Sequence, residues 1–397
     1  MRIIQRLRMP GLLSFPPDMD FFDLQSLNVL IGPNASGKSN FIEVLGLLSA
    51  LPTDFAAAIR DGGGAAEWVW KGSARLSPAT IEVETTSPYY PPLRYRLSFF
   101  PMGPGVAISD ETVEGIHPEP GHEPDFYYTL QQGRPAINIR VRTQDGQEER
   151  SLKWDMRTLD QSVLAQRKDP DLYPELYWFG VVLGTMQSFR EWTFGRYGEL
   201  RGPQRADLPA TWLLPDCSNL ALVLNHIEHK LGPTFDEHVR RFFPRFKRMT
   251  TTVSGGTVQF YLHESDFGKP IPATRLSDGT IRFIALLATL LTPDPQGLPI
   301  PARVVCIEEP ELGLHPDAVA MLADLLVEAS ERMQLVVTTH SDALVSALTN
   351  QPDAIVACER PGAGTELRRL DPERLASWLE DYRLGDLWRM GELGANP

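Results

Sequence analysis

A glycine-rich segment at residues 32–40 constrains the fold of this chain more than any other feature. It reads Gly-Pro-Asn-Ala-Ser-Gly-Lys-Ser-Asn and fits the pattern G-x-x-x-x-G-K-[ST]. An apolar run at residues 27–31 precedes it and a helical pattern at residues 41–45 follows it. We therefore predict a buried strand, a phosphate-binding loop and a helix. Such a loop directs successive backbone N–H groups at phosphate oxygens, and the helix N-terminus adds a partial positive charge.

The side chains of this loop predict a site for a nucleoside triphosphate. Lys38 is expected to reach the β- and γ-phosphates, and the hydroxyl of Ser39 is expected to hold Mg²⁺. A glycine turn with a chance Gly-Lys-Ser is the alternative, and the flanking strand and helix argue against it. The residues predicted to contact the nucleotide are Gly32, Pro33, Asn34, Ala35, Ser36, Gly37, Lys38, Ser39 and Asn40.

Composition limits the class of protein. The chain of 397 residues is long enough for two or three lobes, and its net charge of −13 means that any DNA contact needs a local basic patch. Three scattered cysteines fit a reducing cytosol and argue against a disulfide framework or a cysteine zinc site. No apolar run reaches the roughly 20 residues of a membrane helix. We expect a cytoplasmic protein with no membrane partner.

The order of patterns along the chain predicts two parts. Residues 76–145 are rich in alternating β-type runs, and residues 150–245 turn helical. From about residue 255, strands and helices alternate to the end. We predict an ATPase-like head from residues 1–50 and 255–397, with residues 51–254 as an insertion.

A second apolar run, at residues 303–307, leads into a cluster of acidic residues. Glu308 follows the run directly and is expected on the metal side of the site, while Glu309 is expected to polarise the attacking water. The alternative is a solvated acidic strand end, which would be common without a phosphate loop upstream.

Two further segments complete the pattern. Residues 335–339 form another buried-strand run before His340, which could reach the γ-phosphate or the water, although a lone histidine there is usually structural. Ser277 and Gly279 stand at the start of a helix, where a hydroxyl and free N–H groups can bind an anion. One chain has one triphosphate to bind, so this second helix start makes most sense if it meets a partner's nucleotide.

In this order the motifs resemble those of ATP-binding-cassette ATPases, and more narrowly of their RecF/SMC-like branch. The sequence is similar to stand-alone AAA-family ATPases of the OLD type that lack a TOPRIM domain. The resemblance covers about the first 45 and the last 125 residues. The segments that carry it are residues 32–40, Leu-Ser-Asp-Gly-Thr at 276–280, Ile-Glu-Glu-Pro-Glu at 307–311, Leu-His-Pro at 314–316 and Thr-Thr-His-Ser at 338–341.

The resemblance implies an α/β P-loop fold of the ATP-binding-cassette type, with a mixed sheet flanked by helices and a β-rich and helical insertion. It implies a homodimer that holds two ATP molecules between its heads. Each ATP would meet Lys38 and Ser39 of one subunit and the helix start of the other. Glu309 would activate water and His340 would sense the γ-phosphate. Gln166, chosen over Gln161, would complete the Mg²⁺ shell.

Two residues depart from the family pattern. Glu308 stands where an aspartate is usual, so the metal geometry on that side is open. Asp278 stands in the usual glycine pair of the helix start, and its charge either slows dimer closure or points outward.

The resemblance also bears on function. It implies a Mg²⁺-dependent ATPase that switches a DNA-linked process, in bacterial defence or DNA repair. The stretch after His340 is too short for a nuclease domain, so we expect a nuclease or other effector on a separate chain. An ATPase subunit of a transporter and a protein-regulatory switch without DNA binding are the alternatives. The basic and aromatic segment at residues 239–248 either contacts double-stranded DNA or is the solvated face of a core helix.

Overall fold

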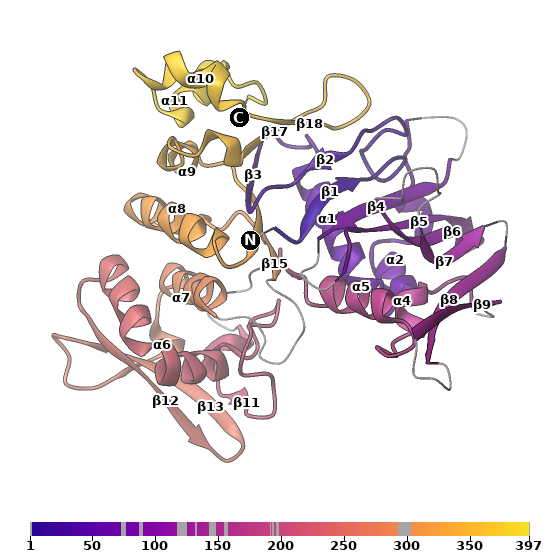
Figure 1. Cartoon of the computed structure of the whole chain (residues 1–397). Helices are drawn as coiled ribbons and strands as arrows, with labels where there is room; N and C mark the ends of the chain where they lie inside the picture. The colour runs from indigo at the N-terminus through magenta and orange to yellow at the C-terminus, as the bar shows by residue number, and fades with distance from the viewer. Residues whose placement is uncertain are drawn as a thin grey trace.

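The computed structural model is organised around a central sheet that carries helices on both faces (Figure 1). It describes residues 2–72, 77–86, 90–116, 125–131, 133–142, 148–154, 158–190, 192, 194–195, 198–292 and 303–396. Neighbouring strands of the central sheet are parallel except at its last pair, which is antiparallel. In order across the sheet, the strands are β10 (Gln187–Phe189), β15 (Val304–Glu308), β16 (Gln334–Thr338), β3 (Leu27–Ile31), β17 (Ile355–Glu359) and β18 (Glu366–Arg369).

Strand alternation divides the hydrophobic interior into two cores. In β3, Val29 and Ile31 face one core and Leu30 faces the other. Both faces are buried because each carries helices, as expected for a parallel sheet. The first core packs against α7 (Asp278–Leu291), α8 (Pro316–Ser330), α9 (Asp342–Ala347) and α11 (Leu384–Met390), and the second packs against α1 (Lys38–Ala50) and α5 (Pro174–Gly184).

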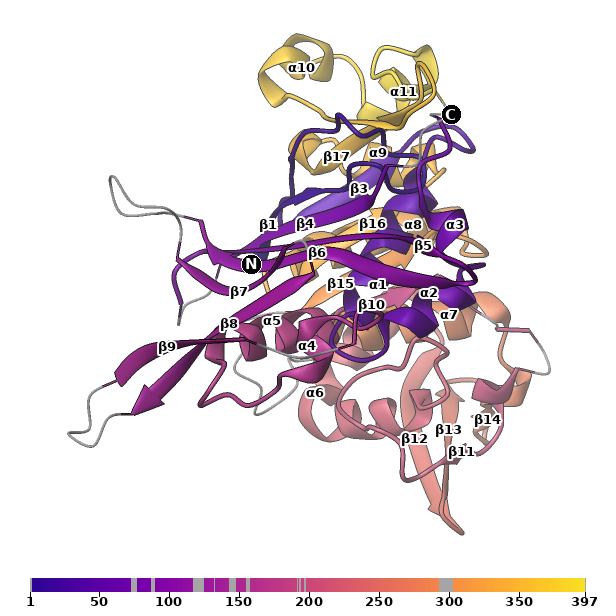
Figure 2. The ribbon, with the colours of Figure 1, turned by 90° about the vertical axis from the view of Figure 1, so that its right-hand side faces the viewer.

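A second, antiparallel sheet, here called the outer sheet, covers the second core (Figure 2). In β5, residues alternate between buried and half-exposed, as expected for a sheet with one face on the core. Short helices pack near it: α2 (Phe55–Asp61), α3 (Ala65–Trp68) and α4 (Val163–Gln166). In order, its strands are β2 (Phe22–Asp23), β1 (Ile4–Arg8), β4 (Ala79–Thr85), β5 (Leu93–Met102), β6 (Gly105–Gly115), β7 (Phe126–Gln131), β8 (Arg134–Arg142) and β9 (Glu148–Trp154).

One buried side chain joins the two sheets. The amide oxygen of Gln334, at the start of β16, accepts hydrogen bonds from the N–H groups of Ile3 (3.2 Å) and Ile4 (2.9 Å). Its amide nitrogen donates to the carbonyl of Ile4 at 2.8 Å. The outer sheet is therefore anchored to the central sheet through backbone groups that would otherwise lack partners.

A small sheet lies at the other end of the molecule (Figures 1 and 2). The long helix α6 (Leu220–Phe242) packs on its strands β12 and β13. The strands of the small sheet are β11 (Gln204–Arg205), β13 (Thr257–Glu264), β12 (Phe246–Ser254) and β14 (Ile271–Pro272). Helix α10 (Pro372–Leu379) lies near the C-terminus, beside α11.

The mixed sheet flanked by helices agrees with the prediction. The predicted insertion, however, shares both large sheets with the predicted head. Strand β10, from within residues 51–254, pairs with β15 in the central sheet, and β4 pairs with β1 in the outer sheet. None of the helices in the described ranges is long and apolar enough to cross a membrane.

Candidate active site

The predicted functional segments follow neighbouring parallel strands. Leu30 of β3 is in register with Thr338 of β16, which is in register with Glu308 of β15. The carboxyl ends of parallel strands meet at one edge of a sheet, where α/β proteins bind ligands. The phosphate loop, the acidic cluster and the segment containing His340 therefore emerge side by side.

The glycines of the phosphate loop are required by close backbone contacts. Gly32 has φ +150°, and a Cβ there would lie 2.3 Å from the carbonyl oxygen of Cys358. Gly37 has φ +108°, and a Cβ there would lie 2.2 Å from the Oγ1 of Thr365. Because neither glycine carries a side chain, the loop can pack tightly against the segments that contain Cys358 and Thr365.

Two polar side chains of the loop, those of Lys38 and Ser36, have no described acceptor outside the loop. The Nζ of Lys38 donates to the carbonyl oxygens of Gly32 (2.7 Å) and Pro33 (2.9 Å). Burial lowers the pKa of Lys38, and the charges of Glu309 and Glu308 oppose this shift. The hydroxyl of Ser36 is buried and has no hydrogen-bond partner within the described ranges. A buried ammonium group and a buried hydroxyl without a partner, in a tightly curled loop at the start of a helix, fit a triphosphate.

The remaining loop residues differ in exposure. Pro33, Asn34, Ala35 and Ser39 are exposed, and Asn40 is half-buried, with its amide donating to the Oγ of Ser14 at 2.8 Å.

Two of the three predicted metal ligands, Ser39 and Glu308, are in contact. The Oγ of Ser39, at the start of α1, donates to the Oε1 of Glu308 at the tip of β15. These residues are 269 positions apart in sequence. A hydroxyl and a carboxylate are the hard oxygen donors that Mg²⁺ takes, with phosphates and water as its other ligands. Glu308 stands where the family pattern usually has an aspartate, and its longer side chain is in contact with Ser39.

The two predicted catalytic side chains lie together. The Oε1 of Glu309 is 3.7 Å from the Nε2 of His340. Glu309 has φ +45°, a left-handed conformation that is strained for a glutamate and is typical of functional sites. Its N–H donates to the carbonyl of Thr338 at 3.0 Å, which fixes it against β16. Burial and the charge of Lys38 lower the pKa of His340, and the nearby Glu309 opposes this shift.

A third carboxylate holds the histidine segment. The Oε1 of Glu311 accepts from the Oγ1 of Thr339 at 2.6 Å and from the N–H of His340 at 3.2 Å. Burial raises the pKa of Glu311, and these hydrogen bonds oppose the shift. The sequence indicated Glu311 only as part of a motif and gave no sign of this contact.

At the start of α7, the side chain of Ser277 is hydrogen-bonded to the backbone of its own turn. The exposed Ser277 caps α7, and its Oγ accepts from the N–H of Thr280 at 3.1 Å. A Cβ on Gly279 would lie 2.7 Å from the carbonyl oxygen of Gly313, in the turn after the acidic cluster. The glycine is therefore explained by packing between these two segments.

The charge of Asp278 has a buried partner. Its Oδ1 accepts from the guanidinium of Arg201, whose side chain is 3% exposed. Arg201 also donates to the carbonyl oxygens of Phe194 (2.9 Å), Ala273 (3.1 Å) and Leu276 (2.6 Å). The sequence analysis did not identify Arg201, because nothing in the pattern around it indicates burial.

The structure does not join Gln166 to the other predicted metal residues by any described hydrogen bond. Its amide nitrogen donates to backbone carbonyls of its own turn, at Gln161 (3.0 Å) and Ser162 (3.4 Å). The side chain that reaches Glu308 from this part of the chain is Arg190, which follows β10 and was not predicted.

The basic segment is partly paired with acids. Arg240 lies near Asp236 (3.5 Å), Arg241 near Asp324 (3.2 Å) and Arg245 near Asp266 (3.6 Å). Lys247 and Arg248, in β12, are exposed. The segment thus spans the end of α6 and the start of the small sheet.

Comparisons with known proteins agree with this architecture. A family model (AAA_21), described as "AAA domain, putative AbiEii toxin, Type IV TA system", matches residues 27–346. None of the curated protein sequences compared with the chain matches it.

Three solved structures of Smc heads also match the chain. An Smc head bound to the C-winged helix domain of ScpA has a TM-score of 0.58 at 14% identity, over 94% of this chain and 99% of that one. An Smc head with an extended coiled coil from Pyrococcus furiosus, bound to the C-terminal domain of ScpA, has a TM-score of 0.56 at 12% identity, over 96% and 99%. One with a coiled coil and joint from Pyrococcus yayanosii has a TM-score of 0.51 at 12% identity, over 96% and 99%. At these identities the likeness shows the fold, and it confirms the predicted one.

Proposed function

Because the chain belongs to the AAA_21 family of AAA domains, we propose that it is a Mg²⁺-dependent ATPase and that ATP joins two copies head to head. The observation that carries this proposal is the contact between Ser39 and Glu308, beside a glycine-lined loop that holds Lys38. It brings together a hydroxyl, a carboxylate and an ammonium group from segments far apart in the sequence. Phosphoryl transfer needs such groups to position the phosphates and to offset their charge.

Each side chain has a role in the proposed reaction. Lys38 releases the loop carbonyls and binds the β- and γ-phosphates. Glu309 accepts a hydrogen bond from the attacking water and orients it toward the γ-phosphate. His340 can donate a hydrogen bond from its imidazole ring to the γ-phosphate or to the water. Glu311 keeps the histidine segment in place.

Mg²⁺ would be held by Ser39 and Glu308, and when bound it would offset charge on the phosphate oxygens. The contact between these residues supports this assignment. Gln166 remains a predicted ligand without a described contact to them.

The proposed dimer rests on exposed residues. Ser277 is exposed, and the turn at residues 312–313 and 315–317 beside Gly279 is exposed as well. In the proposed dimer, Ser277 and Gly279 meet the nucleotide of the partner subunit. In the proposed dimer, the second copy would also cover Leu312, which is 58% exposed in this turn.

Substitution of Glu309 tests the ATPase and the dimer together. Glu309→Gln should bind ATP, lose hydrolysis by at least about a hundredfold, and accumulate as a dimer, because the closed state is no longer opened by hydrolysis. Size-exclusion chromatography with light scattering measures the mass with and without ATP. Lys38→Ala is the matched control and should stay monomeric. A monomeric Glu309→Gln protein at saturating ATP would contradict the sandwich.

We further propose that the ATPase cycle switches a DNA-linked process in bacterial defence or DNA repair, with a nuclease or other effector on a separate chain. The family description, which names a toxin and a toxin–antitoxin system, supports the defence role. The ion pairs of Arg240, Arg241 and Arg245 favour a second candidate, a switch that acts on a protein partner without DNA.

ATP hydrolysis with and without duplex DNA separates the two candidates. Stimulation by DNA supports the DNA-linked switch. A rate indifferent to DNA supports the protein-regulated one.

A further inference from the structure

Arg190 places a permanent cation on the metal side of the candidate site. It directly follows β10, where Phe189 is in register with Ile307, so it comes opposite Glu308. The Nε of Arg190 is 3.4 Å from the Oε2 of Glu308, and its Nη2 is 3.9 Å from the Oε2 of Glu43. The other oxygen of Glu308 accepts from Ser39. The carboxylate of Glu308 therefore contacts both Ser39, the other expected metal ligand, and the guanidinium group of Arg190.

The chemistry of the guanidinium excludes it as a metal ligand. It has no free lone pair and stays protonated at any working pH. It can only neutralise the carboxylates that it contacts. Glu308 and Glu43 are 18% and 26% exposed, so water screens this interaction less than it would on an open surface.

The exposure of Arg190 allows it to move. Its side chain is 39% exposed. The contacts described for its guanidinium are one hydrogen bond to Glu308, at 3.4 Å, and the longer approach to Glu43. Half-exposed pairs of this kind contribute little to folding stability. Displacement of Arg190 from Glu308 would leave both cores intact, since the side chain belongs to neither.

We propose that Arg190 is an internal cation that competes with Mg²⁺ for Glu308 and so sets the Mg²⁺ concentration at which the protein binds ATP tightly. This inference rests on the proposed function. Arg190 acts as a positioning residue: before the nucleotide binds, it holds Glu308 and Glu43 against the end of β10. Binding of a divalent cation at Ser39 and Glu308 requires the guanidinium to give up at least part of this contact.

The test measures nucleotide affinity as a function of free Mg²⁺. A fluorescent, non-hydrolysable ATP analogue is titrated into wild type, Arg190→Gln and Arg190→Lys, from excess EDTA to saturating Mg²⁺. Arg190→Gln removes the charge and should lower the half-saturating Mg²⁺ concentration by about tenfold, since a unit charge about 5 Å from a divalent ion repels it strongly even in water. Arg190→Lys keeps the charge and should stay within about twofold of wild type.

A second readout needs no nucleotide. Binding of Mn²⁺ alone, followed by electron paramagnetic resonance, should be tighter for Arg190→Gln than for wild type. The melting temperatures of the three proteins should agree closely, because the ion pairs are half-exposed.

The outcomes separate this inference from the proposed function. If wild type binds the analogue in a Mg²⁺-dependent way and Arg190→Gln needs as much Mg²⁺ or more, the competition is wrong and the proposed ATPase stands. If wild type binds no analogue at any Mg²⁺ concentration, both fail. A shift of equal size in Arg190→Lys would also overturn the proposal, because it would not follow the charge.

Discussion

At the scale of single residues, the departures from the family pattern have partners that the sequence does not show. Asp278 adds a charge to a helix start expected to meet phosphate, and the buried Arg201 pairs with it. Arg201 also binds three backbone carbonyls, so it fixes the approach to α7 as well as the charge. The negative charge of Asp278 is therefore balanced by Arg201 of the same subunit.

Glu311 gives a pH-dependence prediction. Burial raises the pKa of Glu311 in the folded protein above the unfolded value of 4.5. The folded state then binds more protons than the unfolded state, so its stability falls as pH rises from the unfolded pKa through the raised one. Glu311→Gln keeps an oxygen acceptor for Thr339 and His340 and removes this cost. Its melting temperature relative to wild type should therefore rise with pH over this window.

Thermal unfolding at pH values from about 4.5 to 8 tests this prediction. Glu373→Gln, an exposed glutamate in the first turn of α10, is the matched control. Parallel pH curves for wild type and Glu311→Gln would show that the pKa of Glu311 does not differ between the folded and the unfolded state.

At the scale of elements, long buried strands could be predicted and short ones could not. The runs at residues 27–31 and 335–339 are mostly apolar; the first is β3, and the second overlaps β16 in all but its last residue. Strand β10 has three residues, and only its pairing with β15 makes it a strand. Arg190 follows β10, so its place in the site could not be predicted from sequence. A parallel pairing between segments over a hundred residues apart leaves no local pattern.

The contacts of Glu311 show the same limit within the site. Its motif was visible in the sequence, but its hydrogen bonds to Thr339 and His340 depend on how the turns after β15 and β16 meet. Sequence patterns could bring forward Lys38, Ser39, Glu308, Glu309 and His340 as candidates, because each lies in or directly after a segment with a strong pattern of its own. Their roles remain predictions.

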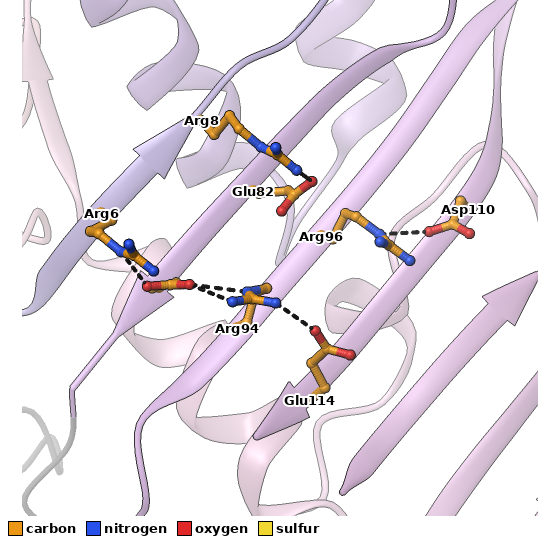
Figure 3. A network of polar contacts seen from close by, with 8 residues as sticks. Arg6, Arg8, Glu82, Arg94, Arg96, Asp110 and Glu114 are labelled. Atoms are coloured by element: carbon orange, nitrogen blue, oxygen red, sulfur yellow. Dashed lines mark hydrogen bonds and ion pairs between the residues drawn. The ribbon is translucent and has the colours of Figure 1, made fainter. Parts of the chain in front are cut away.

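The outer sheet carries a network of arginines and carboxylates across β1, β4, β5 and β6 (Figure 3). The carboxylate of Glu84 is at its centre and accepts from Arg6 (2.7 Å) and Arg94 (2.7 Å). Burial alone would raise the pKa of Glu84, but these two hydrogen bonds outweigh it and the pKa is lowered. The guanidinium groups of Arg6 and Arg94 also lie 4.8 Å and 5.8 Å from the ring centre of Phe21.

Substitution of Glu84 should destabilise this sheet. Glu84→Gln leaves two arginines without their shared carboxylate, and we expect a loss of about 1–3 kcal/mol in the free energy of unfolding. Asp110→Asn is the matched control, because its pair with Arg96 is about a third exposed at 35% and 28%, and should cost under about 1 kcal/mol. Urea denaturation at neutral pH measures both. Equal losses would show that the central position of Glu84 has no special weight.

At the scale of the whole molecule, both large sheets contain strands from either side of the boundaries predicted between head and insertion. Residues 51–254 contain the predicted β-rich and helical stretches, yet they complete both large sheets instead of forming a unit apart. Strand pairing across long sequence separations decides this, and composition does not report it. Helix α6 and the small sheet, whose strands β13 and β14 lie beyond residue 254, are at the end of the molecule away from the outer sheet (Figure 1).

DNA binding is a prediction about the whole molecule. A protein with a negative net charge repels DNA, so it can bind DNA only through a local patch of positive charge. The net charge is −13, and Arg240, Arg241 and Arg245 of the basic segment are already paired with acids. Lys247 and Arg248, adjacent in β12, are exposed and are free of the ion pairs described for their neighbours. If DNA binds here, we expect these two residues to contact phosphates.

The double substitution Lys247→Glu and Arg248→Glu tests that contact. Because the variant can no longer neutralise two phosphates, binding of a duplex should weaken by roughly 10- to 100-fold near 0.1 M salt, and the slope of log affinity against log salt should fall by about two. Arg60→Glu with Arg374→Glu, which are exposed residues on α2 and α10, makes the same change in net charge elsewhere. Fluorescence anisotropy over a salt series measures both slopes.

An equal loss in the control pair would assign the effect to overall charge. Unchanged binding in the folded test variant would leave the segment as the solvated face of α6 and β12. A loss confined to Lys247 and Arg248 would connect the small sheet, at the far end of the molecule from the outer sheet, to the DNA-linked switch.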